Sequence, residues 1–204
     1  MAQIQDIMTI APVIPVLVIH DPAQARPIAE ALVAGGLRAL EVTLRTECAL
    51  EVIAEMAKVE GAVVGAGTVL NGDDLKSAVD VGARFIVSPG LTTGVVQAAR
   101  AAEVPLLPGT ANASDIMRGL DLGLTHFKFF PATAAGGIPA LKALSAPFGQ
   151  VRFCPTGGIK QETAPEWLAL PSVLCVGGSW LVPAGTPDQA AITQRARQAA
   201  ALKG

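Results

Sequence analysis

Short runs of apolar and β-branched residues recur along the chain, each followed by a polar or glycine-containing turn and then by a stretch of helical period. This alternation is typical of repeated βα units, in which each strand leads into a helix that packs back on the sheet. The predicted strands are Val13–Val18, Ala39–Thr43, Val63–Thr68, Arg84–Ser88, Pro105–Pro108, His126–Phe130, Val151–Thr156 and Val173–Gly177.

One helix is expected after every strand, because the intervening stretches space their apolar residues as amphipathic helices do. Eight strands that alternate strictly with eight helices predict an α/β fold, a closed (β/α)8 TIM barrel with an additional N-terminal helix. The alternative, an open doubly wound sheet, expects a G-x-G-x-x-G turn after the first strand, and the sequence has none there. The predicted helices are Pro22–Ala34, Glu47–Val59, Asn71–Val81, Thr92–Ala101, Ala113–Leu122, Ile138–Ala146, Gln161–Leu170 and Pro187–Leu202, after an initial helix at Gln3–Ile10.

The composition narrows the domain organisation and the partners. With 204 residues, 51% hydrophobic and 16% charged, the chain can bury one substantial core, so residues 1–204 are expected to form a single domain. A formal net charge of −2 without clustered Lys or Arg argues against nucleic acid or an anionic membrane as the partner and favours a small molecule. The N-terminus lacks signal-like regions, and no apolar stretch approaches the about 18 residues that cross a bilayer, which predicts a cytoplasmic protein.

The cysteines and histidines offer little for a metal. Cys48, Cys154 and Cys175 are widely spaced and form no C-x-x-C pair, and His20 and His126 form no metal-binding pattern. The sequence therefore predicts no disulfide framework and no metal site.

Lys128 lies inside the run Thr125–Pro131, which otherwise has the pattern of a buried strand ending at a proline. Burial disfavours the charged form of a lysine, so its amine should become nucleophilic near neutral pH. The alternative is that Lys128 lies at a strand end and its ammonium group reaches water, as long charged side chains usually do.

The two-residue period of a strand groups the polar residues. It places Glu41, Thr43 and Arg45 on one face of the second strand, and Lys128 with Phe130 on one face of the sixth. An amine and a carboxylate in one low-dielectric pocket are the minimal set for imine chemistry, in which the amine condenses with a ketone and the carboxylate moves protons. The alternative for Glu41 and Arg45 is a structural ion pair inside the barrel.

Glycines gather at three predicted strand ends. The third strand ends Gly65-Ala-Gly-Thr68, where two glycines let the backbone approach a ligand closely and the threonine offers a hydroxyl. Paired glycines follow the seventh and eighth strands, in Gly157–Gly158 and Gly177–Ser179, at the corner where barrels of this class hold a phosphate. Ordinary tight turns are the alternative. The pattern predicts a phosphorylated carbonyl compound as substrate and leaves Arg45 to bind a second anion, such as a carboxylate.

Six segments carry a further signal: Glu41-Val-Thr-Leu-Arg-Thr46, Gly65-Ala-Gly-Thr-Val-Leu70, Ser88-Pro-Gly90, Lys128-Phe-Phe-Pro-Ala132, Arg152-Phe-Cys-Pro-Thr-Gly-Gly-Ile159 and Val176-Gly-Gly-Ser-Trp180. In order and spacing they resemble the 2-keto-3-deoxy-6-phosphogluconate (KDPG) aldolase / 4-hydroxy-2-oxoglutarate aldolase family. These are class I aldolases, and KDPG aldolase belongs to the Entner–Doudoroff pathway. The resemblance spans nearly the whole chain.

The resemblance implies a role for each matching residue. Lys128 would be the Schiff-base lysine and Glu41 the general acid/base in the reversible cleavage of KDPG to pyruvate and D-glyceraldehyde 3-phosphate. It also implies a homotrimer without metal or organic cofactor and, in some members, cleavage of 4-hydroxy-2-oxoglutarate. The other residues would bind substrate: Arg45 and Thr68 the pyruvyl carboxylate, Pro89, Phe130 and Thr156 the pocket wall, and Gly157, Gly158, Gly178 and Ser179 the phosphate.

Other functions stay open at this point. An aldolase for the galactonate epimer is one, because the stereochemistry of the pocket cannot be read from the sequence. A phosphosugar isomerase or epimerase on this fold would use a base pair or metal ligands at the strand ends and has no special need for Lys128. A non-enzymatic sugar-phosphate-binding barrel would bind phosphate without forming a reducible imine.

Overall fold

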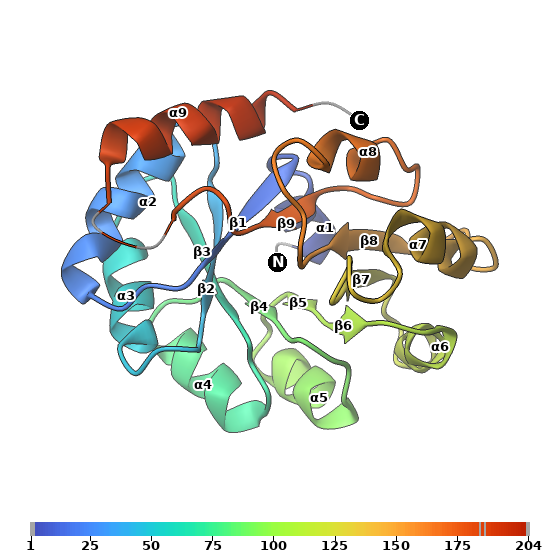
Figure 1. Ribbon diagram of the computed structural model, residues 1–204. Helices are drawn as coiled ribbons and strands as arrows, with labels where there is room; N and C mark the ends of the chain where they lie inside the picture. The colour runs from blue at the N-terminus through green and yellow to red at the C-terminus, as the bar shows by residue number, and fades with distance from the viewer. Residues whose placement is uncertain (1–2, 184, 186, 203–204) are drawn as a thin grey trace.

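Parallel strands lie at the centre of the molecule and helices surround them (Figure 1), in a computed structural model that describes residues 3–183, 185 and 187–202. Residues 1, 2, 184, 186, 203 and 204 of the predicted domain lie outside the described residues. Strands β5, β4, β3, β2, β1 and β9 form one curled sheet in that order, and β6, β7 and β8 form a second. The strands are β1 (Val13–Leu17), β2 (Ala39–Thr43), β3 (Val63–Gly67), β4 (Phe85–Val87), β5 (Leu106–Leu107), β6 (Gly109–Thr110), β7 (His126–Phe129), β8 (Arg152–Pro155) and β9 (Val176–Gly178).

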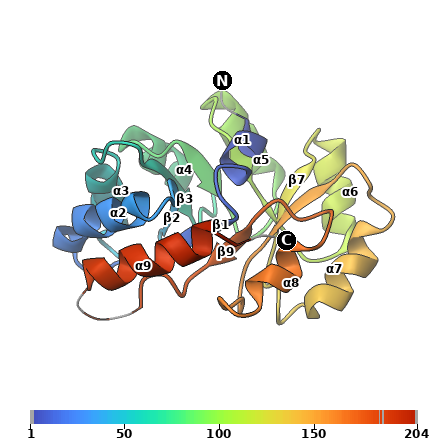
Figure 2. The ribbon, with the colours of Figure 1, turned by 90° about the horizontal axis from the view of Figure 1, so that it is seen from above.

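The helices lie outside the strands, except for α1, which lies at the strands' N-terminal ends (Figures 1 and 2). No helix within the described ranges is long and apolar enough to cross a membrane. The helices are α1 (Ile4–Met8), the 3-10 helix η1 (Pro22–Gln24), α2 (Ala25–Ala34), α3 (Ala49–Met56), α4 (Gly72–Asp80), α5 (Thr93–Ala101), α6 (Ala113–Asp121), α7 (Gly137–Ser145), α8 (Ala164–Leu168) and α9 (Gln189–Ala200).

Local signals in the sequence explain where several helices begin and end. Helices α4, α5, α6 and α9 each follow a residue whose side chain accepts a hydrogen bond from the N–H three positions on, which satisfies one free donor of the first turn. Helices α4 and α6 end before Gly82 and Gly123, whose φ angles of 109° and 71° are rare for a residue with a Cβ. The capping residues are Asn71, Thr92, Asn112 and Asp188.

Two predicted strands and one predicted helix are among the elements that need correction. The strand predicted at Pro105–Pro108 is interrupted at Pro108, which has no N–H to donate, and pairing resumes in β6 beyond the predicted end. The strand predicted at Val173–Gly177 begins at Val176, and Val173 forms only an isolated bridge to Phe153. The helix predicted from Gln161 begins at Ala164, where Pro165 fits the first turn, while the preceding residues form turns.

The apolar residues form two clusters, one on each side of the strands. The outer cluster lies between strands and helices and includes Phe127, Phe129 and Phe153, all at most 1% exposed. The inner cluster, which includes Phe85, is enclosed by the strands and contacted by α1. Because strand side chains alternate, the outward Phe127 and Phe129 turn the intervening residue, Lys128, into the molecule.

The last helix lies beside the helix of the first βα unit on the outside of the fold. Helix α9 lies along α2 in both views (Figures 1 and 2), and the Thr193 hydroxyl donates a hydrogen bond of 3.1 Å to the Ala31 carbonyl. Gly35 allows this approach, since a Cβ there would lie 2.8 Å from the Thr193 carbonyl oxygen. The last helix therefore packs against the first βα unit.

Candidate active site

A cavity of about 470 Å³ opens at the C-terminal ends of the strands. Parallel strands that end at one edge bring together side chains from distant parts of the sequence, and ten of the eleven predicted site residues line this one cavity. These are Glu41, Arg45, Thr68, Pro89, Lys128, Phe130, Thr156, Gly157, Gly158 and Ser179.

The eleventh, Gly178, is not among the lining residues, whereas its neighbour Gly177 is. Strand alternation explains the difference, because Gly177 and Ser179 share the face that Gly178 turns away from. A Cβ on Gly178 would instead lie 2.7 Å from Cη2 of the Trp180 indole ring, and closer still to Cζ3. Strand alternation in β9 could therefore have distinguished Gly177 from Gly178, whereas the Gly-Gly motif alone could not.

Val16, Thr43 and Ile159 also line the cavity and were missed as site residues. Alternation in β2 correctly placed Thr43 on the face of Glu41, although no role in the site was predicted for it. Its hydroxyl donates to the Leu17 carbonyl at 2.9 Å and therefore links β2 to β1. Val16 and Ile159 carry no polar atom in their side chains, and nothing local marked them as lining residues.

The Lys128 Nζ atom donates a hydrogen bond of 3.1 Å to Glu41 Oε1. Both residues are almost fully buried, Lys128 at 6% and Glu41 at 3% exposure, so Lys128 does not extend into water. The Lys128 Nζ atom also lies 5.2 Å from the centre of the Phe130 ring, within the range of a cation–π contact. The ion pair is therefore largely shielded from water, so each charge depends on the other for its compensation.

Paired strands hold both residues in place. Lys128 lies in register with Gly109 of β6 and Cys154 of β8, and its backbone N–H donates to the Pro108 carbonyl at 2.9 Å. Glu41 lies between Val16 of β1 and Gly65 of β3. Side chains that project from the middle of a sheet keep their relative positions better than side chains on loops.

Arg45 and Thr68 lie nearer the mouth. Arg45 is exposed and, among the described residues, forms no salt bridge, so the structural Glu41–Arg45 pair considered from the sequence is not formed. Thr68 has a φ of 60°, an unusual value for a β-branched residue. Backbone strain of this kind is often found at ligand-binding positions.

The loop after β8 forms a turn beside the end of β9. Gly157 and Gly158 have φ angles of 107° and 77°, and the Thr133 N–H donates to the Gly157 carbonyl at 3.0 Å. Within the described ranges, the backbone N–H groups of Gly158 and Ser179 donate to no other residue. Free N–H groups in a turn of this kind can bind an anion.

The buried thiols lie beneath this cavity rather than in it. Cys154 and Cys175 belong to the inner cluster. The hydrogen bond with Cys154, together with burial, raises the pKa of the Cys175 thiol well above its ordinary value. A thiol in this setting stays protonated and is a poor nucleophile.

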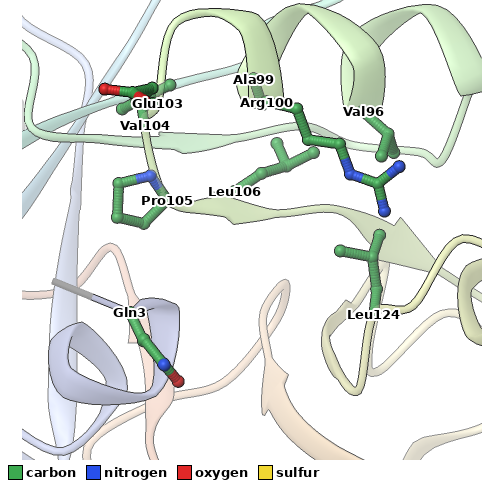
Figure 3. Close-up of a pocket in the computed structure, with 9 residues that line it drawn as sticks. All are labelled: Gln3, Val96, Ala99, Arg100, Glu103, Val104, Pro105, Leu106 and Leu124. Atoms are coloured by element: carbon green, nitrogen blue, oxygen red, sulfur yellow. The ribbon is translucent and has the colours of Figure 1, made fainter. Parts of the chain in front are cut away.

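Another cavity, of about 380 Å³, lies at the opposite end of the strands between α5 and the start of α1 (Figure 3). Its walls are mainly apolar, with Leu106 and Leu124 on one side and Gln3 on the other. Its charged residues, Arg100 and Glu103, are exposed, so no desolvated nucleophile faces it. Among the described residues, no group of three or more His, Cys, Asp or Glu side chains is arranged to hold a metal ion.

Comparisons with known proteins agree with this site. Residues 4–195 match the family model for KDPG and KHG aldolase. The chain is 62% identical over 203 residues to the 2-dehydro-3-deoxy-phosphogluconate aldolase of Zymomonas mobilis, covering 100% of this chain and 98% of that protein. It is 53% identical over 199 residues to the KHG/KDPG aldolase of Escherichia coli K12, covering 96% and 93%.

Two solved structures are similar over nearly their full length. The 2-keto-3-deoxy-6-phosphogluconate aldolase of Zymomonas mobilis with 3-phosphoglycerate has a TM-score of 0.96 at 62% identity, covering 98% of this chain and 96% of that one. The KDPG aldolase of Legionella pneumophila, with pyruvate captured as a covalent carbinolamine, has a TM-score of 0.95 at 46% identity, covering 98% and 99%.

Proposed function

The chain belongs to the KDPG and KHG aldolase family, and we propose that it is a class I aldolase that reversibly cleaves KDPG to pyruvate and D-glyceraldehyde 3-phosphate in the Entner–Doudoroff pathway. The observation that carries the proposal is the buried Lys128–Glu41 pair, at 3.1 Å, in a cavity at the strand ends. The relatives with bound pyruvate and 3-phosphoglycerate support the same chemistry.

Lys128 supplies the covalent step. Its amine, once neutral, adds its lone pair to the C2 ketone of KDPG, and loss of water from the carbinolamine gives a protonated imine. The imine accepts the electron pair of the C3–C4 bond when that bond breaks, and glyceraldehyde 3-phosphate departs from the resulting enamine. Protonation at C3 and hydrolysis then release pyruvate and restore Lys128.

Glu41 moves the protons. As a carboxylate it takes the proton of the C4 hydroxyl, directly or through one water, while the C3–C4 bond breaks. The carboxylic acid then returns a proton to C3 of the enamine. Its position 3.1 Å from the Lys128 Nζ atom supports this role, because C3 is bonded to the imine carbon that forms on that nitrogen.

The other lining residues position the substrate. Arg45 and Thr68 bind the pyruvyl carboxylate, since a guanidinium group and a hydroxyl suit a carboxylate. Pro89, Phe130 and Thr156 form the wall of the pocket. Gly157, Gly158, Gly178 and Ser179 hold the phosphate, and the backbone N–H groups of Gly158 and Ser179, free among the described residues, support the assignment.

The proposal also includes the barrel architecture, the oligomeric state, the location in the cell and a second substrate. The two sheets make one closed (β/α)8 barrel in a single domain, which is supported by the single proline between β5 and β6 and by the bridges Phe153–Val173 and Thr156–Gly177 on the other side. The assembly is a homotrimer in the cytoplasm. We also include 4-hydroxy-2-oxoglutarate as a second substrate, because the Escherichia coli relative is named a KHG/KDPG aldolase.

Borohydride trapping tests the proposal. Incubation with pyruvate and sodium borohydride should attach a reduced pyruvyl group to Lys128, located by mass spectrometry of peptides. Lys128→Ala should abolish both the adduct and turnover of KDPG, while Lys76→Ala, at a side chain that is 74% exposed, should change neither. An adduct elsewhere, or phosphate-dependent binding without an adduct, would reject the assignment. Pyruvate release from KDPG, its galactonate epimer and 4-hydroxy-2-oxoglutarate, measured side by side, decides among the aldolase substrates.

A further inference from the structure

We propose that Gly67 is a positioning residue, and that the absence of a side chain there lets Glu41 reach Lys128. The inference rests on the proposed function, in which Glu41 is the acid/base. A Cβ placed on Gly67 would lie 2.7 Å from Cγ and 2.8 Å from Cδ of Glu41, and closer still to Oε1. These separations are below the 3.0 Å that real Cβ contacts respect. Glu41 therefore lies across the space that any side chain at position 67 would need.

Gly67 is needed for space rather than for backbone freedom. It is the last residue of β3, pairs in register with Thr43 of β2, and is not among the glycines with a positive φ. An L-residue can therefore adopt its backbone conformation without strain. The carboxylate of Glu41 is what excludes a larger residue.

The neighbouring inward glycine of β3 serves a different side chain. A Cβ on Gly65 would lie 2.5 Å from the ring of Phe85, in the inner cluster. The sequence motif Gly65-Ala-Gly67 suggested close approach of the backbone to a ligand. In the structure the two glycines make room for the protein's own side chains. Gly65 accommodates the ring of Phe85, and Gly67 accommodates the carboxylate of Glu41.

A methyl group at position 67 would displace the Glu41 carboxylate. Glu41 is 3% exposed, so packing limits where it can move, and its oxygen would leave the position from which it contacts Lys128 Nζ at 3.1 Å. Misplacing a catalytic group by about 1 Å can lower a rate by roughly 100-fold. Gly67→Ala should therefore lower kcat for KDPG by about that factor and change KM much less. Pyruvate should still be trapped on Lys128, because the three atoms nearest to a Cβ at position 67 all belong to Glu41.

A double-mutant cycle with Glu41→Ala separates positioning from general damage to the fold. Without the Glu41 side chain, the added methyl meets no carboxylate, so Glu41→Ala/Gly67→Ala should match Glu41→Ala in both kcat and urea midpoint. Strong non-additivity of this kind shows that one substitution acts through the other. Gly94→Ala is the matched control, because nothing lies within 4 Å of a Cβ at that position of α5, and its kcat should equal that of the wild type.

These measurements test the inference about Gly67 and the proposed aldolase function separately. Wild-type kcat in Gly67→Ala would overturn the inference, as would a further loss of kcat or of urea midpoint when Gly67→Ala is added to Glu41→Ala. If Gly67→Ala does not fold, a folded double variant still supports the steric conflict, and an unfolded one overturns it. Failure of the wild type to cleave KDPG would reject the proposed function alone, since the cycle in urea midpoints needs no turnover.

Discussion

The buried Glu41–Lys128 pair makes a quantitative prediction about stability. Glu41→Gln keeps the shape of the side chain but removes its negative charge, so the Lys128 ammonium group, in a residue only 6% exposed, would lie beside a neutral amide. Removing one partner of a buried ion pair costs about 3–5 kcal/mol, because the remaining charge stays desolvated without compensation. We expect the free energy of unfolding at pH 7 to fall by that amount.

Urea unfolding, followed by the fluorescence of Trp167 and Trp180 at fixed protein concentration, measures the change. For a chain of this length, the same loss corresponds to a decrease in Tm of about 6–20 °C. The control is the exposed pair between Lys76 and Asp80, whose side chains are 74% and 58% exposed. Asp80→Asn should cost no more than about 0.5 kcal/mol, since water screens the charges of an exposed helix pair.

The double variant Glu41→Gln/Lys128→Met completes the experiment. It removes both charges, so it should recover most of the stability that Glu41→Gln loses, because no buried charge is then left unpaired. A loss below about 1 kcal/mol for Glu41→Gln, similar to that of an exposed pair, would refute the claim that the pair is desolvated. A double variant as unstable as Glu41→Gln would refute the claim that the unpaired ammonium group causes the loss.

Three further predictions follow from individual residues. Thr68→Gly removes a positive-φ strain of about 1–3 kcal/mol, so the protein should become no less stable while KM for KDPG rises, and unchanged KM would argue against Thr68 as a substrate contact. Burial, and secondarily the Arg152 charge, lower the pKa of His126 below its usual value of 6.5, so the unfolded state binds more protons and stability should rise with pH through the range just below 6.5. Urea midpoints should show a smaller rise in His126→Gln, and an identical rise would contradict this. Phe153→Ala, at a fully buried ring of the outer cluster, should cost about 3–5 kcal/mol in urea unfolding, and a cost below about 1 kcal/mol would show that the site collapses around the loss.

The sequence predicted the order and type of the elements because both depend on neighbouring residues. Apolar periodicity marks strands and helices through the geometry of the backbone, and capping residues such as Asn71 act within one turn. Alternation in β2 and β7 correctly turned Glu41 and Lys128 toward the cavity. The predicted strand Pro105–Pro108 ended too early. A proline interrupts strand pairing, but the local sequence does not show that pairing resumes at Gly109.

Most of the residues that line the site could be predicted from the sequence, but their contacts could not. The Lys128–Glu41 hydrogen bond joins residues 87 positions apart, and nothing in either local pattern states their distance. The same is true of Gly67, whose sequence motif suggested approach of a ligand until the structure placed the Glu41 side chain across it. Local periodicity determined which face of its strand each side chain occupies, because the alternation of side chains depends only on the neighbouring residues of the same strand. Tertiary packing alone decided which side chains meet, because that depends on how separate strands are arranged around a shared interior.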